Sequence, residues 1–205
     1  MGIFALLSNT EKKFNNHRST SSKVDLRRRV LAEFPEARVL DCYAGPEGEM
    51  WRAVWSEASS YHGIDRLWQK SDPRQRFVGD TTRILRTLDL APWNVFDVDA
   101  FGDPWATALI LVERRRWARG ERGAVCITDG TSIKLRTGSM PLSMQTLIGC
   151  ATSATSATSA TSATIHQACL TALLKRWNAK PLKLWQVEPK GPASMAYSAC
   201  VFEGR

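Results

Sequence analysis

Three aspartates follow one another closely in the stretch NVFDVDAFGDPW, which spans residues 94–105. Asp97, Asp99 and Asp103 lie within seven residues, and the stretch begins as an apolar strand. Carboxylates are rarely buried without a partner. A strand that crosses the core and then ends in acids predicts that the acids are delivered to the edge of a sheet, where a ligand binds.

Acids also follow almost every other predicted strand. An aspartate after a strand is commonly a helix cap or a turn residue, and that explains any one of them. It explains the whole set less well, because Asp41 and Asp97 lie inside apolar runs. Ligands of parallel sheets bind beyond the carboxyl ends of the strands, so the set indicates a ligand site. Outside the opening stretch, the strand-end acids are Asp41, Asp65, Asp80 and Asp129.

The elements that would position these acids alternate between strand and helix. This alternation predicts an α/β fold with a parallel sheet and helices on both faces. The last two predicted strands are joined by a connection too short for a parallel crossover, so they form an antiparallel pair. We therefore predict a doubly wound, mostly parallel seven-stranded sheet with a C-terminal antiparallel hairpin. The predicted strands are 38–43, 61–64, 75–78, 93–98, 123–128, 182–187 and 196–202, and the helices are 47–58, 81–90, 104–119 and 165–178.

Two segments are predicted to lie outside this regular alternation. Residues 1–23 are predicted as a flexible polar and basic arm, and residues 24–205 as the folded domain. Ser22 is a suitable cap for a helix that runs to about Phe34. Residues 151–164 form an Ala-Thr-Ser repeat, which is predicted to be a low-complexity loop because its small polar side chains bury little surface.

The charge of the chain is unevenly distributed. The net charge is +8, yet residues 41–104 hold 11 acidic and 7 basic residues. An acidic stretch within a basic chain indicates one surface for a cationic or hydroxyl-bearing ligand and another for a polyanion. The alternative is that the basic residues only form a solvated face.

Composition also excludes some classes of protein. No apolar run approaches the length of a membrane span, so no membrane partner is expected. The five cysteines are odd in number and dispersed, which is typical of buried thiols in a reducing cytoplasm. Neither the cysteines nor the three histidines show metal-ligand spacing, so we expect no metal site.

The turn at 44–48, with the sequence AGPEG, is suited to a nucleoside-containing ligand. Its glycines allow the backbone to approach a ligand closely. Asp65 follows about 20 residues later, the spacing at which an acid binds ribose hydroxyls in nucleotide-binding α/β folds. Glu47 and Glu49 would repel a pyrophosphate, so a nicotinamide dinucleotide is disfavoured and a cationic ligand is favoured.

These motifs together resemble those of class I S-adenosylmethionine-dependent methyltransferases. The matching stretches are VLDCYAG at 39–45, GID at 63–65 and VGD at 78–80, and the resemblance covers roughly residues 36–205. It implies that S-adenosyl-L-methionine is the cofactor. It further implies that the turn cradles the methionine part, that Asp41 orients it, that Asp65 holds the ribose and that Asp80 accepts from the adenine amine. The cofactor-binding residues implied in this way are Asp41, Tyr43, Ala44, Gly45, Gly48, Asp65, Arg66, Asp80, Thr81 and Asp97.

The opening stretch resembles the D-x-D-P-F-G pattern of tRNA guanine-N2 dimethyltransferases. The resemblance implies methylation of an exocyclic amine, with Asp99 as the catalytic acid and Phe101 as a stacking residue. In an alternative register the catalytic motif is Asp103, Pro104 and Trp105. The simpler explanation of Pro104 and Trp105 is a helix start and its packing anchor.

Basic clusters favour a nucleic acid, RNA or DNA, as the acceptor. Acceptors on a protein or a small molecule remain alternatives, as does a non-catalytic protein that uses this fold for binding. The cluster at 114–116 can also be the solvated face of a helix, and the oligomeric state is left open. The candidate nucleic-acid-binding residues are Arg114, Arg115, Arg116, Lys134 and Arg136.

Overall fold

Seven strands form one mixed sheet in the computed structural model, which describes residues 17–67, 72–149, 162–187 and 195–205. The strand order is β3-β2-β1-β4-β5-β7-β6. The first five strands are parallel, and β7 pairs antiparallel with both β5 and β6. The predicted sheet and its terminal hairpin are therefore confirmed. The strands are β1 Arg38–Asp41, β2 Ser60–Asp65, β3 Arg76–Val78, β4 Val95–Val98, β5 Arg122–Asp129, β6 Ala179–Val187 and β7 Ala196–Gly204.

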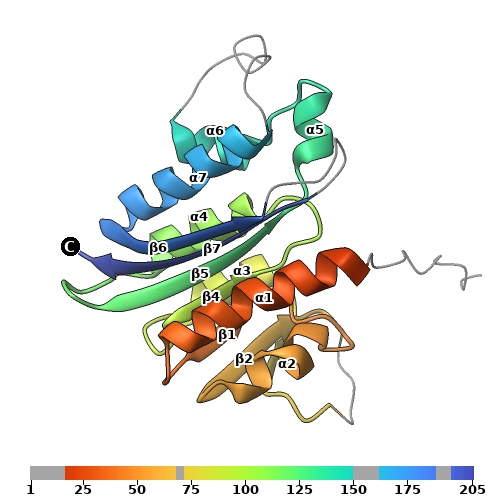
Figure 1. Ribbon diagram of the computed structural model, residues 1–205, viewed down its shortest axis with the longest axis vertical. Helices are drawn as coiled ribbons and strands as arrows, with labels where there is room; N and C mark the ends of the chain where they lie inside the picture. The colour runs from red at the N-terminus through yellow and green to blue at the C-terminus, as the bar shows by residue number, and fades with distance from the viewer. Residues whose placement is uncertain (1–16, 68–71, 150–161, 188–194) are drawn as a thin grey trace, which may run out of the picture.

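Helices cover both faces of the sheet, as predicted (Figure 1). Helices α1 and α2 lie on the near face in Figure 1, and α3, α4, α6 and α7 lie on the far face, where α4 contacts α3, α6 and α7. The helices are α1 His17–Glu33, α2 Glu49–Ala53, α3 Thr81–Thr87, α4 Trp105–Arg114, α5 Ser132–Arg136, α6 Leu142–Ile148 and α7 Ser162–Arg176, and a short 3-10 helix spans Trp55–Glu57.

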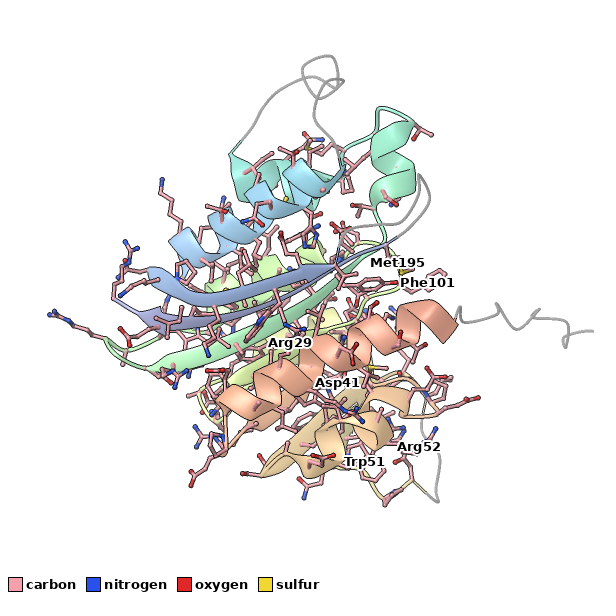
Figure 2. The ribbon with its side chains drawn as sticks, in the orientation of Figure 1. Arg29, Asp41, Trp51, Arg52, Phe101 and Met195 are labelled. Atoms are coloured by element: carbon pink, nitrogen blue, oxygen red, sulfur yellow. The ribbon has the colours of Figure 1, made fainter. Side chains whose placement is uncertain are left out.

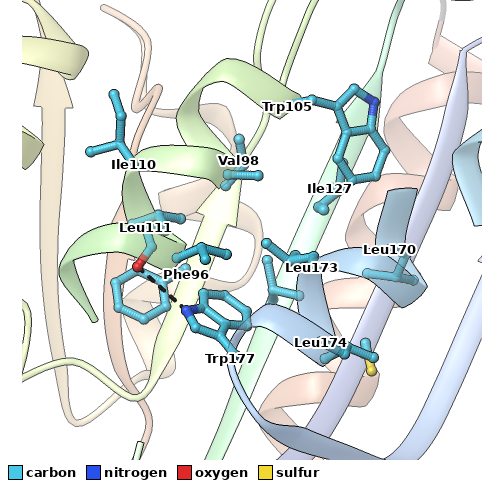
Figure 3. Packing of buried hydrophobic residues seen from close by; sticks show 14 of the residues in the cluster. Phe96, Val98, Trp105, Ile110, Leu111, Ile127, Leu170, Leu173, Leu174 and Trp177 are labelled. Atoms are coloured by element: carbon cyan, nitrogen blue, oxygen red, sulfur yellow. Dashed lines mark hydrogen bonds between the residues drawn. The ribbon is translucent and has the colours of Figure 1, made fainter. Parts of the chain in front are cut away.

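The core has two parts because successive strand side chains point to opposite faces. On the α1 side, Val39 and Val95 pack against Val30 and Trp55. On the far side, Phe96 packs beneath α4 and α7, and the indole of Trp177 donates to the Leu111 carbonyl at 3.3 Å (Figure 3). Sheet positions therefore alternate between two apolar layers, and any acid on a central strand enters one of them.

Several element boundaries differ from those predicted. Helix α1 begins at His17, not at Ser22, so residues 17–23 are not part of a flexible arm. The last three residues of the Ala-Thr-Ser repeat, 162–164, belong to α7. Residues 1–16 and 151–161 lie outside the described residues. The polar composition of these segments concealed the helix ends, since Ser and Thr favour helices less than Ala or Leu.

Two short helices between β5 and α7 were not predicted. Lys134 and Arg136, two of the candidate nucleic-acid-binding residues, lie in α5, and α6 follows at Leu142–Ile148. Helix α6 begins just after Pro141 and ends at Gly149, which has the left-handed backbone typical of a helix C-terminus. Each is too short to show a clear apolar period, so periodicity alone did not reveal them.

Three further properties follow from the described part of the chain. Every helix there is too short or too polar to cross a bilayer. The four cysteines within it are buried and form no disulfide. No cluster of three or more His, Cys, Asp or Glu side chains in these residues is arranged to hold a metal ion.

Candidate functional site

The carboxyl ends of the parallel strands bring most of the predicted site residues to one edge of the sheet. Asp41 on β1 lies in register with Asp97 on β4, and Asp65 ends the neighbouring strand β2. Phe101 lies at the same edge with 77% of its surface exposed (Figure 2). The edge is therefore lined with acids and carries an exposed aromatic ring.

Asp97 is fully buried, and it is neutralised by helix α1 rather than by a ligand. The Arg27 guanidinium donates to both of its oxygens, from Nε at 2.6 Å and from Nη2 at 2.5 Å. The Trp55 indole donates to Oδ2 at 2.7 Å. These contacts occupy both oxygens of Asp97, and its predicted role in binding the cofactor stays a prediction. The acid inside the apolar strand is there to anchor α1.

Asp99, the candidate catalytic acid, pairs with a second cation from the same helix. Lys23 Nζ donates to its two oxygens at 2.7 and 2.9 Å, and Arg27 Nη2 lies 3.7 Å away. Burial alone would raise the pKa of Asp99, but the charges of Arg27 and Lys23 outweigh it and lower the pKa. Asp99 is thus an ionised carboxylate that already accepts hydrogen bonds from an ammonium group.

Asp41 lies on the same face of the sheet, but no cation among the described residues is bonded to it. Its Oδ1 accepts from the Tyr43 backbone N–H at 3.0 Å, and its Oδ2 accepts from the Tyr61 hydroxyl at 2.9 Å. Burial, together with the charge of Asp97, raises the pKa of Asp41 to about 8. The protonated acid therefore supports the turn that follows β1.

The raised pKa of Asp41 predicts a specific pH dependence of stability. The unfolded chain releases this proton near its ordinary pKa of about 3.9, whereas the folded protein holds it until about pH 8. The stabilisation that comes from this retained proton is complete below the pKa of Asp41 in the unfolded chain, and it is lost as the pH rises through the pKa of Asp41 in the folded protein. The substitution Asp41→Asn mimics the protonated acid at every pH. We expect the free energy of unfolding of this variant, relative to that of the wild type, to be higher at about pH 8 than at about pH 5 by on the order of a few kcal/mol. Urea unfolding at the two pH values measures this, and equal differences at both would contradict it.

Asp65 and Asp80, the acids predicted to bind the ribose and the adenine, differ in how many of the protein's own donors they accept from. Asp65 is partly exposed, and its Oδ1 accepts from the Leu67 backbone N–H at 2.7 Å. Asp80 caps α3 by accepting from the N–H groups of Thr82 and Arg83, and it also pairs with Arg66. The Thr82 hydroxyl and the Arg66 guanidinium lower the pKa of Asp80. Asp80 therefore acts first as a helix cap, while Asp65 keeps room for a further donor.

Residues beside these acids support the strand ends. The Thr81 hydroxyl donates to the Cys42 carbonyl at 2.8 Å. The Tyr43 hydroxyl shares a hydrogen bond of 2.7 Å with the Thr107 hydroxyl of α4. Arg66 is exposed and reaches back to Asp80. These contacts hold β1, α3 and α4 together beneath the site edge.

The alternative motif at Asp103, Pro104 and Trp105 has a structural role. Asp103 accepts from the Trp105 backbone N–H at 2.9 Å and from the Ser143 hydroxyl at 2.6 Å. Pro104 and Trp105 are buried, and the Trp105 indole donates to Asp129 at 2.9 Å. The simpler explanation, a helix start with its packing anchor, therefore describes these contacts.

Asp129 belongs to a buried polar network behind the site. His166 Nδ1 lies 3.0 Å from Asp129 Oδ2, and its Nε2 lies 2.9 Å from the Ser198 hydroxyl. Thr131 donates to Asp129 through its backbone and its hydroxyl. All of these groups are buried, and their hydrogen bonds join β5, α7 and β7.

The predicted basic cluster on α4 does not lie at the site edge. Helix α4 runs back across the sheet, so residues 114–116 lie near the start of β5 at the opposite edge. Arg115 is buried, pairs with Glu121 and stacks on the Trp117 ring at 3.9 Å, and its predicted contact with nucleic acid stays a prediction. Arg114 and Arg116 are exposed there. A hollow of about 630 Å³ at this far edge is lined by Arg119, Gly120, Glu203, Gly204 and Arg205.

Solved structures share the fold of this chain, although no protein-family model and no curated protein matches the sequence. Trm1 from Pyrococcus horikoshii, in complex with S-adenosyl-L-methionine, superimposes with a TM-score of 0.62 at 12% identity over 93% of this chain. The N-methyltransferase NodS from Bradyrhizobium japonicum WM9, in complex with S-adenosyl-L-homocysteine, gives a TM-score of 0.56 at 12% identity over 96% of this chain and 93% of its own. The chain has a methyltransferase fold.

A third structure with this methyltransferase fold is TYW2 from M. jannaschii in complex with AdoMet. It gives a TM-score of 0.51 at 10% identity over 95% of this chain and 80% of its own. The match to Trm1 covers only 56% of that chain, so this protein spans little more than half of it. At these identities the likeness concerns the fold.

Sequence reasoning missed the residues that neutralise and shape the site of this methyltransferase fold. Lys23 and Arg27 are four residues apart and therefore share one face of α1, a spacing that pointed to a common target. Their partners Asp99 and Asp97 lie 76 and 70 positions away in the chain, so no local pattern joined them. Arg74, which contacts the glycine turn, was missed for the same reason.

Proposed function

We propose that the protein is an S-adenosylmethionine-dependent methyltransferase that acts on an amine. The observation that carries this proposal is the placement of the 44–48 turn and Asp65 at the carboxyl edge of a sheet with the order 3-2-1-4-5-7-6. Ligands of such sheets bind at this edge, where the strand order reverses between β1 and β4. The three superimposed structures, each a complex with the cofactor or with the product S-adenosyl-L-homocysteine, support the proposal.

The residues of this chain fit the chemical groups of that cofactor. Gly45 and Gly48 both have positive φ angles, 65° and 60°, which let the backbone turn sharply next to a ligand. Asp65 is partly exposed and can accept hydrogen bonds from two ribose hydroxyls. Leu67 and Val78 are exposed beside it, 59% and 53%, and offer apolar surface to an adenine ring. When bound, the cofactor supplies a methyl group on a sulfonium, which is already activated for transfer.

The chain's own contribution to transfer would be the positioning of the acceptor. Asp99 is ionised and stands just past the end of β4, where it accepts from the Lys23 ammonium group. An acceptor amine could donate to the same oxygens if Lys23 moved away from Asp99. The carboxylate would then orient the lone pair of the amine toward the methyl group. Lys23 thus marks the place of a nitrogen donor beside Asp99.

The finer proposal is that the acceptor is an exocyclic amine of a base in RNA or DNA. Phe101 supports it, because its ring is 77% exposed two residues beyond Asp99 and can stack on a planar base. A base within a duplex would have to be flipped out, so an unpaired site is expected to be the better substrate. A small-molecule or protein amine is the second candidate, favoured by the acidic site edge and by the burial of Arg115.

We expect Asp65→Ala to weaken S-adenosylmethionine binding by roughly 1–3 kcal/mol, because ribose hydroxyls would lose their acceptor. Isothermal titration calorimetry measures the loss. Asp89→Ala is a suitable control, since Asp89 is exposed after α3 and accepts from the Ala91 N–H at 3.0 Å. If the wild-type protein binds no S-adenosylmethionine, the proposed function fails.

The acceptor class is tested by transfer of a tritiated methyl group to pools of tRNA, rRNA, DNA, protein and small amines. Label that enters an RNA or DNA pool supports the finer proposal if, after digestion to nucleosides, it is recovered in a methylated base. Label confined to protein or to small amines supports the second candidate instead. Phe101→Ala is expected to weaken the binding of a base acceptor by about 1–3 kcal/mol, because the base loses its stacking partner.

A further inference from the structure

Arg74 lies just before β3, and its guanidinium contacts the turn that follows β1. Nη1 donates to the Ala44 carbonyl at 2.9 Å, and Nη2 donates to the carbonyls of Gly45 and Pro46 at 2.9 and 3.2 Å. The Arg74 side chain is buried. One side chain therefore holds three consecutive carbonyls of the proposed cofactor turn.

Asp72 fixes this guanidinium from the other side. Arg74 Nε donates to the two Asp72 oxygens at 2.8 and 3.0 Å, and Nη2 also contacts Asp72. The paired arginine lowers the pKa of Asp72 to about 2, so the acid stays ionised. A buried arginine charge needs such a partner. The ion pair lets the guanidinium remain in the turn without an uncompensated charge.

The glycine at position 48 is required by the same contact. A Cβ built on Gly48 would lie 2.6 Å from the Arg74 Cζ, and the φ of Gly48 is +60°. A Cβ on Gly45 would meet no atom within 4 Å, although its φ is +65°. Gly45 is therefore needed for backbone conformation alone, whereas Gly48 is needed also to admit Arg74.

The contact determines which way the peptide groups of the turn face. In a planar trans peptide the C=O and the N–H point in opposite directions. With the carbonyls of residues 44 and 46 directed at Arg74, the N–H groups of Gly45 and Glu47 point to the other side. We propose that Arg74 is a positioning residue that holds the turn so that these N–H groups face the cofactor. This inference rests on the proposed function.

The test compares Arg74→Lys with Arg76→Lys. A lysine keeps the charge but has no planar fork, so it cannot hold three carbonyls. Arg76 is a matched control because it pairs with the same Asp72 at 3.0 Å and donates to the Leu67 carbonyl. We expect Arg74→Lys to weaken S-adenosylmethionine binding about tenfold or more, and Arg76→Lys to weaken it less than about threefold.

Kinetics with the methyl acceptor distinguish positioning from general damage. Arg74→Lys is expected to raise the KM for S-adenosylmethionine while leaving the KM for the acceptor unchanged, because only the cofactor turn is altered. Gly48→Ala, which pushes the guanidinium away without removing its charge, is expected to weaken cofactor binding in the same way. Thermal unfolding midpoints are recorded for each variant.

The outcomes separate the two proposals. Wild-type protein that is folded but binds no S-adenosylmethionine refutes the proposed function and this inference with it. Wild-type binding that Arg74→Lys and Gly48→Ala leave intact refutes the positioning role alone. Equal losses of affinity and stability in the Arg74 and Arg76 variants would show that both arginines only support the fold. Failure of Arg74→Lys and Gly48→Ala to fold would show the same. Either result overturns the inference.

Discussion

Arg27→Met is expected to lower the free energy of unfolding by about 3–5 kcal/mol, the cost typical of removing one partner of a buried ion pair. Arg27 is 1% exposed and Asp97 is fully buried, so no water can replace the two lost hydrogen bonds. Asp97 would retain the Trp55 indole as a donor but not its counter-charge. Urea unfolding followed by circular dichroism measures the change.

Two controls locate the origin of this destabilisation. Arg29→Met changes an exposed arginine of the same helix and is expected to alter stability by no more than about 0.5 kcal/mol. The double variant Arg27→Met with Asp97→Leu removes both charges and is expected to recover much of the loss, because an apolar pair avoids the cost of burying ions. If the double variant is no more stable than Arg27→Met, the isolated charge of Asp97 is not the cause.

Asp99→Ala is expected to reduce methyl transfer by at least about 100-fold, because loss of a positioning group is costly even when the chemistry itself is unchanged. Cofactor affinity is expected to stay within about threefold, since the partner of Asp99 is the acceptor. A single-turnover assay with labelled S-adenosylmethionine measures transfer, and calorimetry measures binding. This prediction depends on the proposed function.

Lys23 and Asp103 provide the controls for Asp99. Lys23→Met removes the ammonium group but leaves the carboxylate, so activity should persist if Asp99 itself positions the acceptor. Asp103→Ala removes the acceptor of the Trp105 N–H at the start of α4 and the Ser143 hydrogen bond, and is expected to cost about 1 kcal/mol of stability with activity retained. Full activity in Asp99→Ala with loss in Asp103→Ala would establish the Asp-Pro-Trp register. Full activity in both would refute amine positioning by this stretch.

The strand-end acids show how far local patterns extend. Asp41, Asp65 and Asp97 were predicted to share one edge, and they do, because parallel strands all end at the same side of a sheet. Their individual roles did not follow from that position. Asp97 anchors a helix, Asp41 supports a turn, and Asp65 is partly exposed and accepts only from a nearby backbone N–H among the described contacts. What decides between these roles is whether a donor from another element reaches the carboxylate.

The sequence by itself determined the order of the strands and of the longer helices, the parallel sheet and its antiparallel end, because apolar periodicity and connection length are local properties of the chain. Only the tertiary structure decided which charges are compensated. Helix α1 lays Lys23 and Arg27 over β4, and Arg74 enters the turn after β1. A buried charge must find its partner wherever packing places one, and packing joins residues that are 76, 70 and 30 positions apart in the chain.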